Sequence, residues 1–157
     1  VGTNVNKWND TAPTTTLFSL GNSGEVNDTT PMIAYCFTDI QGYSKFGSYK
    51  GNGNANGTFV YTGFRPAYVM VKASSTTGLW YIFDDKREGQ NAASTYGNNR
   101  LYANDTSAES TNSHIDILSN GFKCRTAGDP NTANTYIYAA FAESSFVNSN
   151  GVPTNAR

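Results

Sequence analysis

Charged side chains are scarce in this sequence. Only 15% of its 157 residues are Asp, Glu, Lys or Arg, and the formal net charge is −1. A protein that binds nucleic acid or an anionic membrane surface by charge needs a basic patch, and this composition does not supply one. We therefore expect no nucleic-acid partner.

Residues that commonly carry chemistry are also rare. The sole histidine, His114, would have to support any His-based metal site or Ser-His-Asp triad alone, so we expect neither. Asp84, Asp85 and Glu88 could bind calcium, but two basic residues between them favour local salt bridges instead. No pair among the 12 acidic residues stands out as catalytic, and we predict no enzyme, no metal and no cofactor.

Two further absences concern the cysteines and long apolar runs. The only cysteines, Cys36 and Cys124, can be a disulfide or two buried thiols. The second interpretation is favoured because Cys36 lies inside an apolar run, where a small buried residue fits. No run approaches the roughly 18 apolar residues of a membrane span, so no membrane insertion is expected.

Neutral polar and aromatic residues take the place of charge. The chain has 19 Asn, 33 Ser plus Thr and 15 Gly, and 13% of its residues are aromatic. This mixture suits sheets joined by tight turns and does not suit long helices. The length is that of one domain with its own core. We therefore predict an all-β fold.

Apolar runs of strand length recur along the whole chain. We expect about 9–11 short strands, which lie at 14–20, 32–38, 42–49, twice within 59–72, and at 79–83, 100–102, 115–118, 122–126, 136–142 and 146–147. In the central pair, Val69 and Val71 should share one sheet face, with Tyr68, Met70 and Lys72 on the other. Asn120-Gly121 predicts a hairpin turn.

An internal repeat organises the prediction. The order of turn, loop, apolar strand and acidic end occurs at residues 18–39 and again at 117–143. Residues 57–147 would form a full unit and residues 14–49 half a unit, within one domain at 14–157. A half unit leaves an apolar face and a sheet edge that need cover, either from the full unit or from another copy of the chain.

The first 13 residues form a separate, polar arm in this prediction. The stretch is polar and aperiodic apart from Val5 and Trp8, and we expect these two to anchor the arm on a partner surface, which makes them candidates for self-assembly. Together with the half unit, the arm favours a chain that associates with copies of itself through the arm and an open sheet edge.

Sugar binding is the alternative function. Aromatic side chains near strand ends and long loops could form a shallow glycan site, and the candidates are Trp80, Tyr81, Tyr96 and Tyr102. Aromatic residues in strands also pack sheets, so both interpretations stay open. Candidate N-glycosylation sequons lie at Asn9, Asn27, Asn56 and Asn104. About four sequons are expected by chance in a chain so rich in Asn, Ser and Thr.

Several motifs resemble one family. They are Ile33-Ala34-Tyr35-Cys36-Phe37, residues 42–49, Gly51-Asn52-Gly53, residues 59–67, residues 118–123, residues 135–138, Ala140-Phe141-Ala142-Glu143 and Gly151-Val152-Pro153-Thr154. Over roughly residues 17–157 the chain resembles an uncharacterised domain near the C-terminal end of phage tail and appendage proteins from aquatic environments.

The resemblance implies a fold, a location and a structural role. The expected fold is an antiparallel, lectin-like β-sandwich of the jelly-roll type. The expected role is a virion or extracellular appendage subunit, as in a phage tail fibre or a free filament, with no activity. Family members should carry an opening half unit before Thr14, which leaves open whether this chain is a fragment or a self-completing form.

Overall fold

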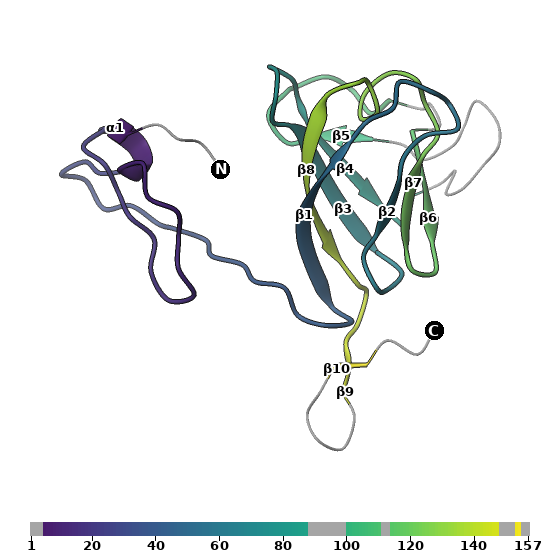
Figure 1. The fold of residues 1–157 in the computed structure, drawn as a ribbon, viewed down its shortest axis with the longest axis horizontal. Coiled ribbons are helices and arrows are strands. Elements are labelled where there is room, and N and C mark those ends of the chain that lie inside the picture. Colours follow the sequence, from purple (N-terminus) through teal and green to yellow (C-terminus); the bar gives the residue numbers. More distant parts are fainter. Residues whose placement is uncertain (1–4, 88–99, 111–113, 148–152, 155–157) are drawn as a thin grey trace. The chain divides into compact units, whose positions relative to one another are not determined.

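Two compact units make up the chain in the computed structural model. They are Val1–Phe37, here called the N-terminal unit, and Thr38–Arg157, here called the sandwich unit. The structure describes residues 5–87, 100–110, 114–147 and 153–154 (Figure 1). The division falls after residue 37, whereas the sequence predicted an arm that ends at residue 13 and a single domain from residue 14 onward.

The N-terminal unit contains one short helix, α1 (Val5–Trp8), which the sequence did not predict. A turn farther along the chain holds the helix in place, because the N–H groups of Gly21 and Ser23 donate to the carbonyls of Lys7 (2.8 Å) and Asn6 (2.7 Å). The close approach requires glycine, since a Cβ on Gly21 would lie 2.2 Å from the Asn6 carbonyl oxygen. The predicted arm is thus part of a folded loop structure.

The strands predicted at 14–20 and 32–38 do not form in the described structure. In the first, Thr14 closes a turn instead: its N–H donates to the carbonyl of Leu17 (2.8 Å) and its Oγ1 accepts from the Leu17 N–H (3.0 Å). Such local bonds compete with strand formation. In the second, no strand among the described residues supplies the ladder of hydrogen bonds that an apolar stretch needs to become a strand.

The sandwich unit is built on a five-stranded antiparallel sheet with the order β1-β8-β3-β4-β5. Its strands are β1 (Ser44–Lys50), β3 (Tyr68–Ala73), β4 (Trp80–Asp84), β5 (Leu101–Tyr102) and β8 (Thr135–Phe141). β8 lies in the interior of the sheet and pairs with β1 and β3 over most of its length. Like β3, it therefore has a neighbouring strand on each side (Figure 1).

A second antiparallel sheet has the order β2-β7-β6. Its strands are β2 (Phe59–Tyr61), β6 (Ile115–Leu118) and β7 (Gly121–Cys124). The predicted hairpin is confirmed, because Leu118 pairs with Gly121 across the turn that contains Asn120. A small additional pair joins β9 (Phe146–Val147), where a short strand was predicted, to β10 (Pro153–Thr154), where none was predicted.

The core lies between the two larger sheets. Phe122 of the second sheet contacts Tyr138 and Tyr49 of the first, with ring centroids 5.6 and 5.9 Å apart. Val69 and Val71 are fully buried, so the predicted face of β3 is confirmed. The fold is all-β with two antiparallel sheets that fit a sandwich, and its ten strands within the described residues agree with the predicted number.

The two cysteines are free thiols with different surroundings. Cys124 is buried as predicted, and burial raises the pKa of its thiol to about 11. The prediction of a buried Cys36 was wrong: this thiol is exposed, because the apolar run around it is not a strand of the sheet. Among the described residues, no helix has the length and apolar character required to span a membrane.

Candidate functional site

An exposed apolar stretch is the most unusual surface of the N-terminal unit. We call Met32–Cys36 the apolar segment. The exposed fractions are 47% for Met32, 80% for Ile33 and 79% for Tyr35, and Phe37, which follows directly, is 66% exposed. Large apolar side chains gathered in one exposed stretch mark an interaction surface more often than a solvent-facing one.

A second apolar surface lies at the edge strand β2 of the sandwich unit. The side chains of Phe59 and Tyr61 are 43% and 65% exposed. Thr58 and Thr62, which flank β2, direct their backbone groups toward β7. The Thr58 carbonyl accepts a hydrogen bond from the Cys124 N–H, and the Thr62 N–H donates to the Asn120 carbonyl. Backbone direction alternates along a strand, so the N–H and C=O groups of Phe59 and Tyr61 point away from β7. We call this row the β2 edge.

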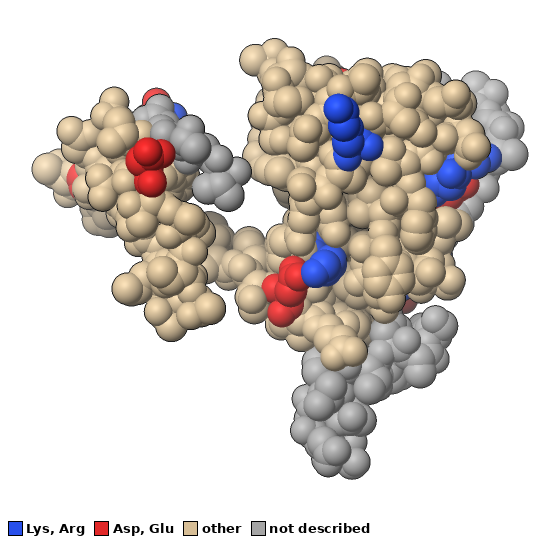
Figure 2. Space-filling model, viewed as in Figure 1, with Lys and Arg blue, Asp and Glu red and all other residues tan. Residues whose placement is uncertain are grey.

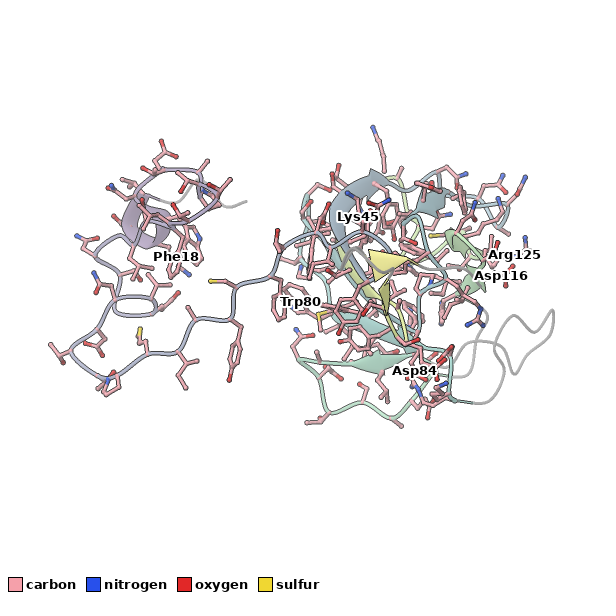
Figure 3. The ribbon with its side chains drawn as sticks, turned by 90° about the horizontal axis from the view of Figure 1, so that it is seen from below. Phe18, Lys45, Trp80, Asp84, Asp116 and Arg125 are labelled. Atoms are coloured by element: carbon pink, nitrogen blue, oxygen red, sulfur yellow. The ribbon has the colours of Figure 1, made fainter. Side chains whose placement is uncertain are left out.

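The opposite edge of the same sheet, at β6, has a different character. Asp116 of β6 forms an ion pair with Arg125, with 3.2 Å between the carboxylate oxygen and Nε (Figure 3). Charged side chains protect a sheet edge from pairing with another strand. The β2 edge has no charge at Phe59–Tyr61, and Figure 2 shows widely scattered charged groups on the face that it draws.

The predicted self-assembly residues, Val5 and Trp8, both lie on α1. Their exposed fractions are 58% and 37%. The helix sits in the same unit as the apolar segment, and both present apolar side chains to solvent. The structure therefore adds the apolar segment to the surface expected from the sequence, which had placed residues 32–38 inside a sheet.

Two of the predicted glycan-binding residues come together in the sandwich unit. The rings of Tyr81 and Tyr102 pair across β4 and β5, with centroids 5.9 Å apart. The Arg100 guanidinium lies over both, 4.7 Å from the Tyr81 centroid and 5.3 Å from the Tyr102 centroid. Tyr81 is 6% exposed, so this cluster offers Tyr102 rather than Tyr81 to a ligand.

The other two glycan candidates lie elsewhere. Trp80 is next to Tyr81 on β4, and its side chain therefore points to the opposite face of the sheet, where it is 36% exposed (Figure 3). Tyr96 lies outside the described residues. The four residues do not form one aromatic platform in the described structure.

A carboxylate hub that the sequence did not reveal lies beside Tyr81. Asp129 accepts hydrogen bonds from the hydroxyls of Tyr81 (3.1 Å), Tyr136 (2.5 Å) and Thr132 (3.1 Å). Burial, together with the Asp129 charge, raises the pKa of both tyrosines to about 12. With three hydroxyl donors, the carboxylate joins β4, β8 and the loop before β8, which is a structural role.

His114 lies at the border of this hub. Its side chain is 6% exposed, and Arg100 Nη1 is 3.5 Å from its Nδ1. Burial first and the positive charge of Arg100 second lower the pKa of His114 to about 4. The imidazole is therefore neutral at physiological pH, and within the part of the chain that the structure describes no carboxylate orients it as a catalytic triad would require.

The charged end of β4 forms ion pairs. Asp84 pairs with Arg87 (2.7 Å), which also pairs with Glu109 (2.9 Å), and Asp85 pairs with Arg65 (2.8 Å). Burial raises the pKa of Asp84, but hydrogen bonds from Arg87 and Lys86 outweigh it, and the pKa falls below its usual value. Glu88 lies outside the described residues, among which no cluster of His, Cys, Asp and Glu could hold a metal.

The four sequons all lie on exposed backbone. Asn9, Asn27, Asn56 and Asn104 are each exposed. Two of them have side-chain bonds: Asn27 Nδ2 donates to the Gly21 carbonyl (2.9 Å), and Asn104 Oδ1 accepts from the Trp80 N–H (2.8 Å). Exposure makes all four sterically accessible to modification.

Comparison with known proteins identifies the family. Residues 1–145 match a family described as a domain of unknown function, DUF7483. The chain belongs to the DUF7483 family. No curated protein and no solved structure matches it.

The DUF7483 match extends over surfaces in both units. It includes α1 and the apolar segment of the N-terminal unit, and β2 and the Asp129 hub of the sandwich unit. Its description assigns no activity or ligand. A functional conclusion for this DUF7483 protein must therefore be drawn from its own surfaces.

Proposed function

We propose that the chain is a non-enzymatic structural subunit of an extracellular appendage, a phage tail fibre or a free filament, that associates with copies of itself. The observation that carries the proposal is the apolar segment, where Ile33 and Tyr35 are each about 80% exposed. Leaving such a surface in water is unfavourable by about 25 cal/mol per Å² of apolar area. Assembly with another copy would cover it.

Two further features support self-association. Low charge allows close packing of identical subunits without strong repulsion. The apolar β2 edge provides an uncharged strand to which another chain could pair. The chain passes repeatedly between the two sheets, from β1 to β2 to β3 and from β7 to β8, which supports a lectin-like, jelly-roll type for the sandwich.

Sedimentation velocity over a wide concentration range tests the proposal. The expected result is a concentration-dependent shift from monomer to larger species, which electron micrographs of the same samples should show as fibres or closed oligomers. A chain that sediments as a monomer at every concentration would refute it. The variant Thr76→Asp, at an exposed loop position of the sandwich unit, should associate like wild type, so that one added charge outside the apolar segment has no effect.

A receptor-binding module for host surface glycan is the second candidate function. The observations that favour it are the exposed face of Trp80 and the Tyr102 ring, which Arg100 holds through a 2.9 Å hydrogen bond from Nε to the tyrosine hydroxyl. Aromatic faces next to fixed polar groups are typical of shallow sugar sites.

A glycan array tests this second candidate, with Trp80→Ala and Tyr102→Ala measured separately. The two side chains belong to different surfaces of the sheet, so one variant should abolish binding and the other should leave it unchanged. An array without hits, or hits that neither variant alters, would refute glycan recognition by these residues.

A further inference from the structure

We propose that the apolar segment of one copy adds as a fourth strand to the β2 edge of a second copy, in the order segment-β2-β7-β6. The inference rests on the proposed self-association and names its contact. Three observations support it. The segment is similar in sequence to β8, side-chain hydrogen bonds end the hairpin between the segment and β1, and the sheet edges differ in charge and in existing partners.

The segment has the sequence of a strand from the interior of a sheet, with a neighbouring strand on each side. In the internal repeat, Met32–Phe37 aligns with Tyr136–Phe141 of β8, with Ile and Phe at the same positions in both stretches. In β8 the alternate residues Tyr136, Tyr138 and Ala140 are buried at 0%, 8% and 0% exposure. The segment therefore has the apolar pattern of an interior strand, although the chain provides it with no strand neighbours in the described structure.

The hairpin that leads from the segment into β1 contains one paired position, Ile40 with Ser44, and its backbone pairing ends there. Ile40 and Ser44 exchange both backbone hydrogen bonds, at 3.0 and 2.9 Å. In a continuing hairpin, the next bond would run from the Phe46 N–H to the Thr38 carbonyl. Instead, that N–H donates to Asp39 Oδ1 (2.8 Å), and the Thr38 carbonyl accepts from Ser44 Oγ (2.9 Å).

This closure uses the two backbone groups, the Thr38 carbonyl and the Phe46 N–H, that would continue pairing with β1 of the same chain. The Asp39 carboxylate also forms an ion pair with Lys45, so both charges are neutralised at the point of closure. The chain before Thr38 can extend the β1 hairpin only by breaking these bonds. A strand-forming segment whose local pairing is blocked must find its hydrogen-bond partners on another strand edge.

Among the edges of the two larger sheets, the β2 edge fits the segment best. Asp39 and Ile40 occupy one end of the β1 edge, and Thr58 Oγ1 occupies the Lys50 carbonyl at the other (2.8 Å). Beyond β5, Arg100 already pairs with Ser110. The β6 edge carries the Asp116–Arg125 ion pair.

Pairing would cover exposed apolar side chains of the apolar segment and of the β2 edge and would provide backbone hydrogen-bond partners for both. The segment has no charged residue, so burying it leaves no unpaired charge. Its Ile33 and Tyr35 would lie beside Phe59 and Tyr61, and aromatic or β-branched pairs across two strands stabilise a sheet by about 0.2–1 kcal/mol each. The ladder of backbone bonds would supply the rest of the contact.

Disulfide trapping in the full chain tests this contact, in a Cys36→Ser background that removes the exposed native thiol. Tyr35→Cys places a thiol in the segment, and Phe59→Cys or Tyr61→Cys places a second thiol on the same face of the β2 edge. Ile137→Cys is the matched control for the second thiol, since Ile137 is 36% exposed on the outer face of β8. Leaving out Tyr35→Cys removes the partner thiol, and buried Cys124 stays out of reach of the oxidant. Products are read on non-reducing gels after mild oxidation.

The expected result is a ladder of covalent oligomers from Tyr35→Cys combined with Phe59→Cys or Tyr61→Cys. The ladder should disappear when Tyr35→Cys is left out, and it should be absent when Ile137→Cys replaces the thiol on the β2 edge. An equal ladder from Ile137→Cys, or disulfides only within single chains, would overturn the inference. If wild type assembles but neither β2 variant is trapped, the strand contact is wrong while the proposed function stands. If wild type stays monomeric, both fail.

Discussion

The stretches Met32–Phe37 and Tyr136–Phe141 have similar sequences and opposite surroundings. The second is β8, whose Tyr136 and Ala140 are fully buried between neighbouring strands. In the first, Ile33 is 80% exposed, against 36% for Ile137 at the aligned position, and Cys36, which aligns with Ala140, is exposed. An apolar strand sequence thus indicates that the stretch needs strand neighbours, and it does not indicate which chain supplies them.

The largest expected difference comes from placing the same charge at aligned positions of the two stretches. Ala140→Asp puts a carboxylate where the side chain is fully buried, and we expect it to lower the free energy of unfolding by more than about 4 kcal/mol. Cys36→Asp changes an exposed position and should alter that free energy by less than about 0.5 kcal/mol.

Urea denaturation checks stability, and sedimentation checks association, for both variants. Cys36→Asp should remain folded and lose the tendency to assemble, because a charge in the segment opposes its burial. If Cys36→Asp destabilised the fold as strongly as Ala140→Asp, the segment would be a core strand of its own chain, and the comparison would fail.

The next largest effect is a pH dependence that belongs to the sandwich unit. The pKa of His114 is about 4 in the folded chain against 6.5 in its ordinary state. The unfolded chain therefore binds more protons as the pH falls below 6.5, and the folded chain loses stability through this window, by up to about 3 kcal/mol near pH 4.

Urea denaturation at pH 7.5 and pH 4.5 measures this loss in wild type and in His114→Gln, which stays neutral. Wild type should lose about 2 kcal/mol more than the variant between the two pH values. Because His114 is the only histidine of the chain, no other imidazole can contribute. Equal losses in both proteins would show that the ring is protonated in the folded state.

A smaller contrast concerns two asparagines, one in each unit. Asn131 is fully buried, and its amide makes five hydrogen bonds that hold the loop at 52–58 against the one at 126–134. Asn27 is exposed and makes one, to the Gly21 carbonyl. We expect Asn131→Ala to cost about 2–3 kcal/mol and Asn27→Ala less than about 0.5 kcal/mol. Thermal unfolding of both variants measures the difference, and equal costs would contradict it.

The smallest effect should stay within the N-terminal unit. A methyl group on Gly21 would overlap the Asn6 carbonyl, so Gly21→Ala should loosen the turn that holds α1. Trypsin should then cleave faster after Lys7, while the unfolding temperature of the sandwich unit stays the same. Gly24→Ala is the matched control, because its added Cβ meets nothing within 4 Å. A lowered unfolding temperature would show that the two units are coupled.

Much of the sandwich unit followed from local sequence rules. The alternation of Val69 and Val71 with polar or larger residues predicted the buried face of β3, and Asn120-Gly121 predicted the β6–β7 hairpin. These signals are local, because a strand alternates with a period of two and a tight turn needs specific residues. Nearby residues alone therefore carry this information.

The features that the sequence did not predict correctly depend on specific contacts, which an apolar strand pattern does not reveal. The predicted strand at 14–20 failed because Thr14 forms a turn, and the one at 32–38 failed because Asp39 takes the N–H that would continue the hairpin. The Asp129 carboxylate hub, whose backbone carbonyl also accepts a hydrogen bond from Arg100, joins residues that are far apart in the sequence. No sequence motif therefore marks it. The glycan candidates were split because Trp80 and Tyr81 are adjacent on one strand and face opposite ways.

The most direct test of the account is amide hydrogen exchange at residues 32–36, measured in dilute monomer and in assembled material. We predict fast exchange in the monomer, where the segment has no strand partner within the described structure, and strong protection after assembly, when its backbone joins a sheet. Fast exchange of these amides in both states would contradict the account.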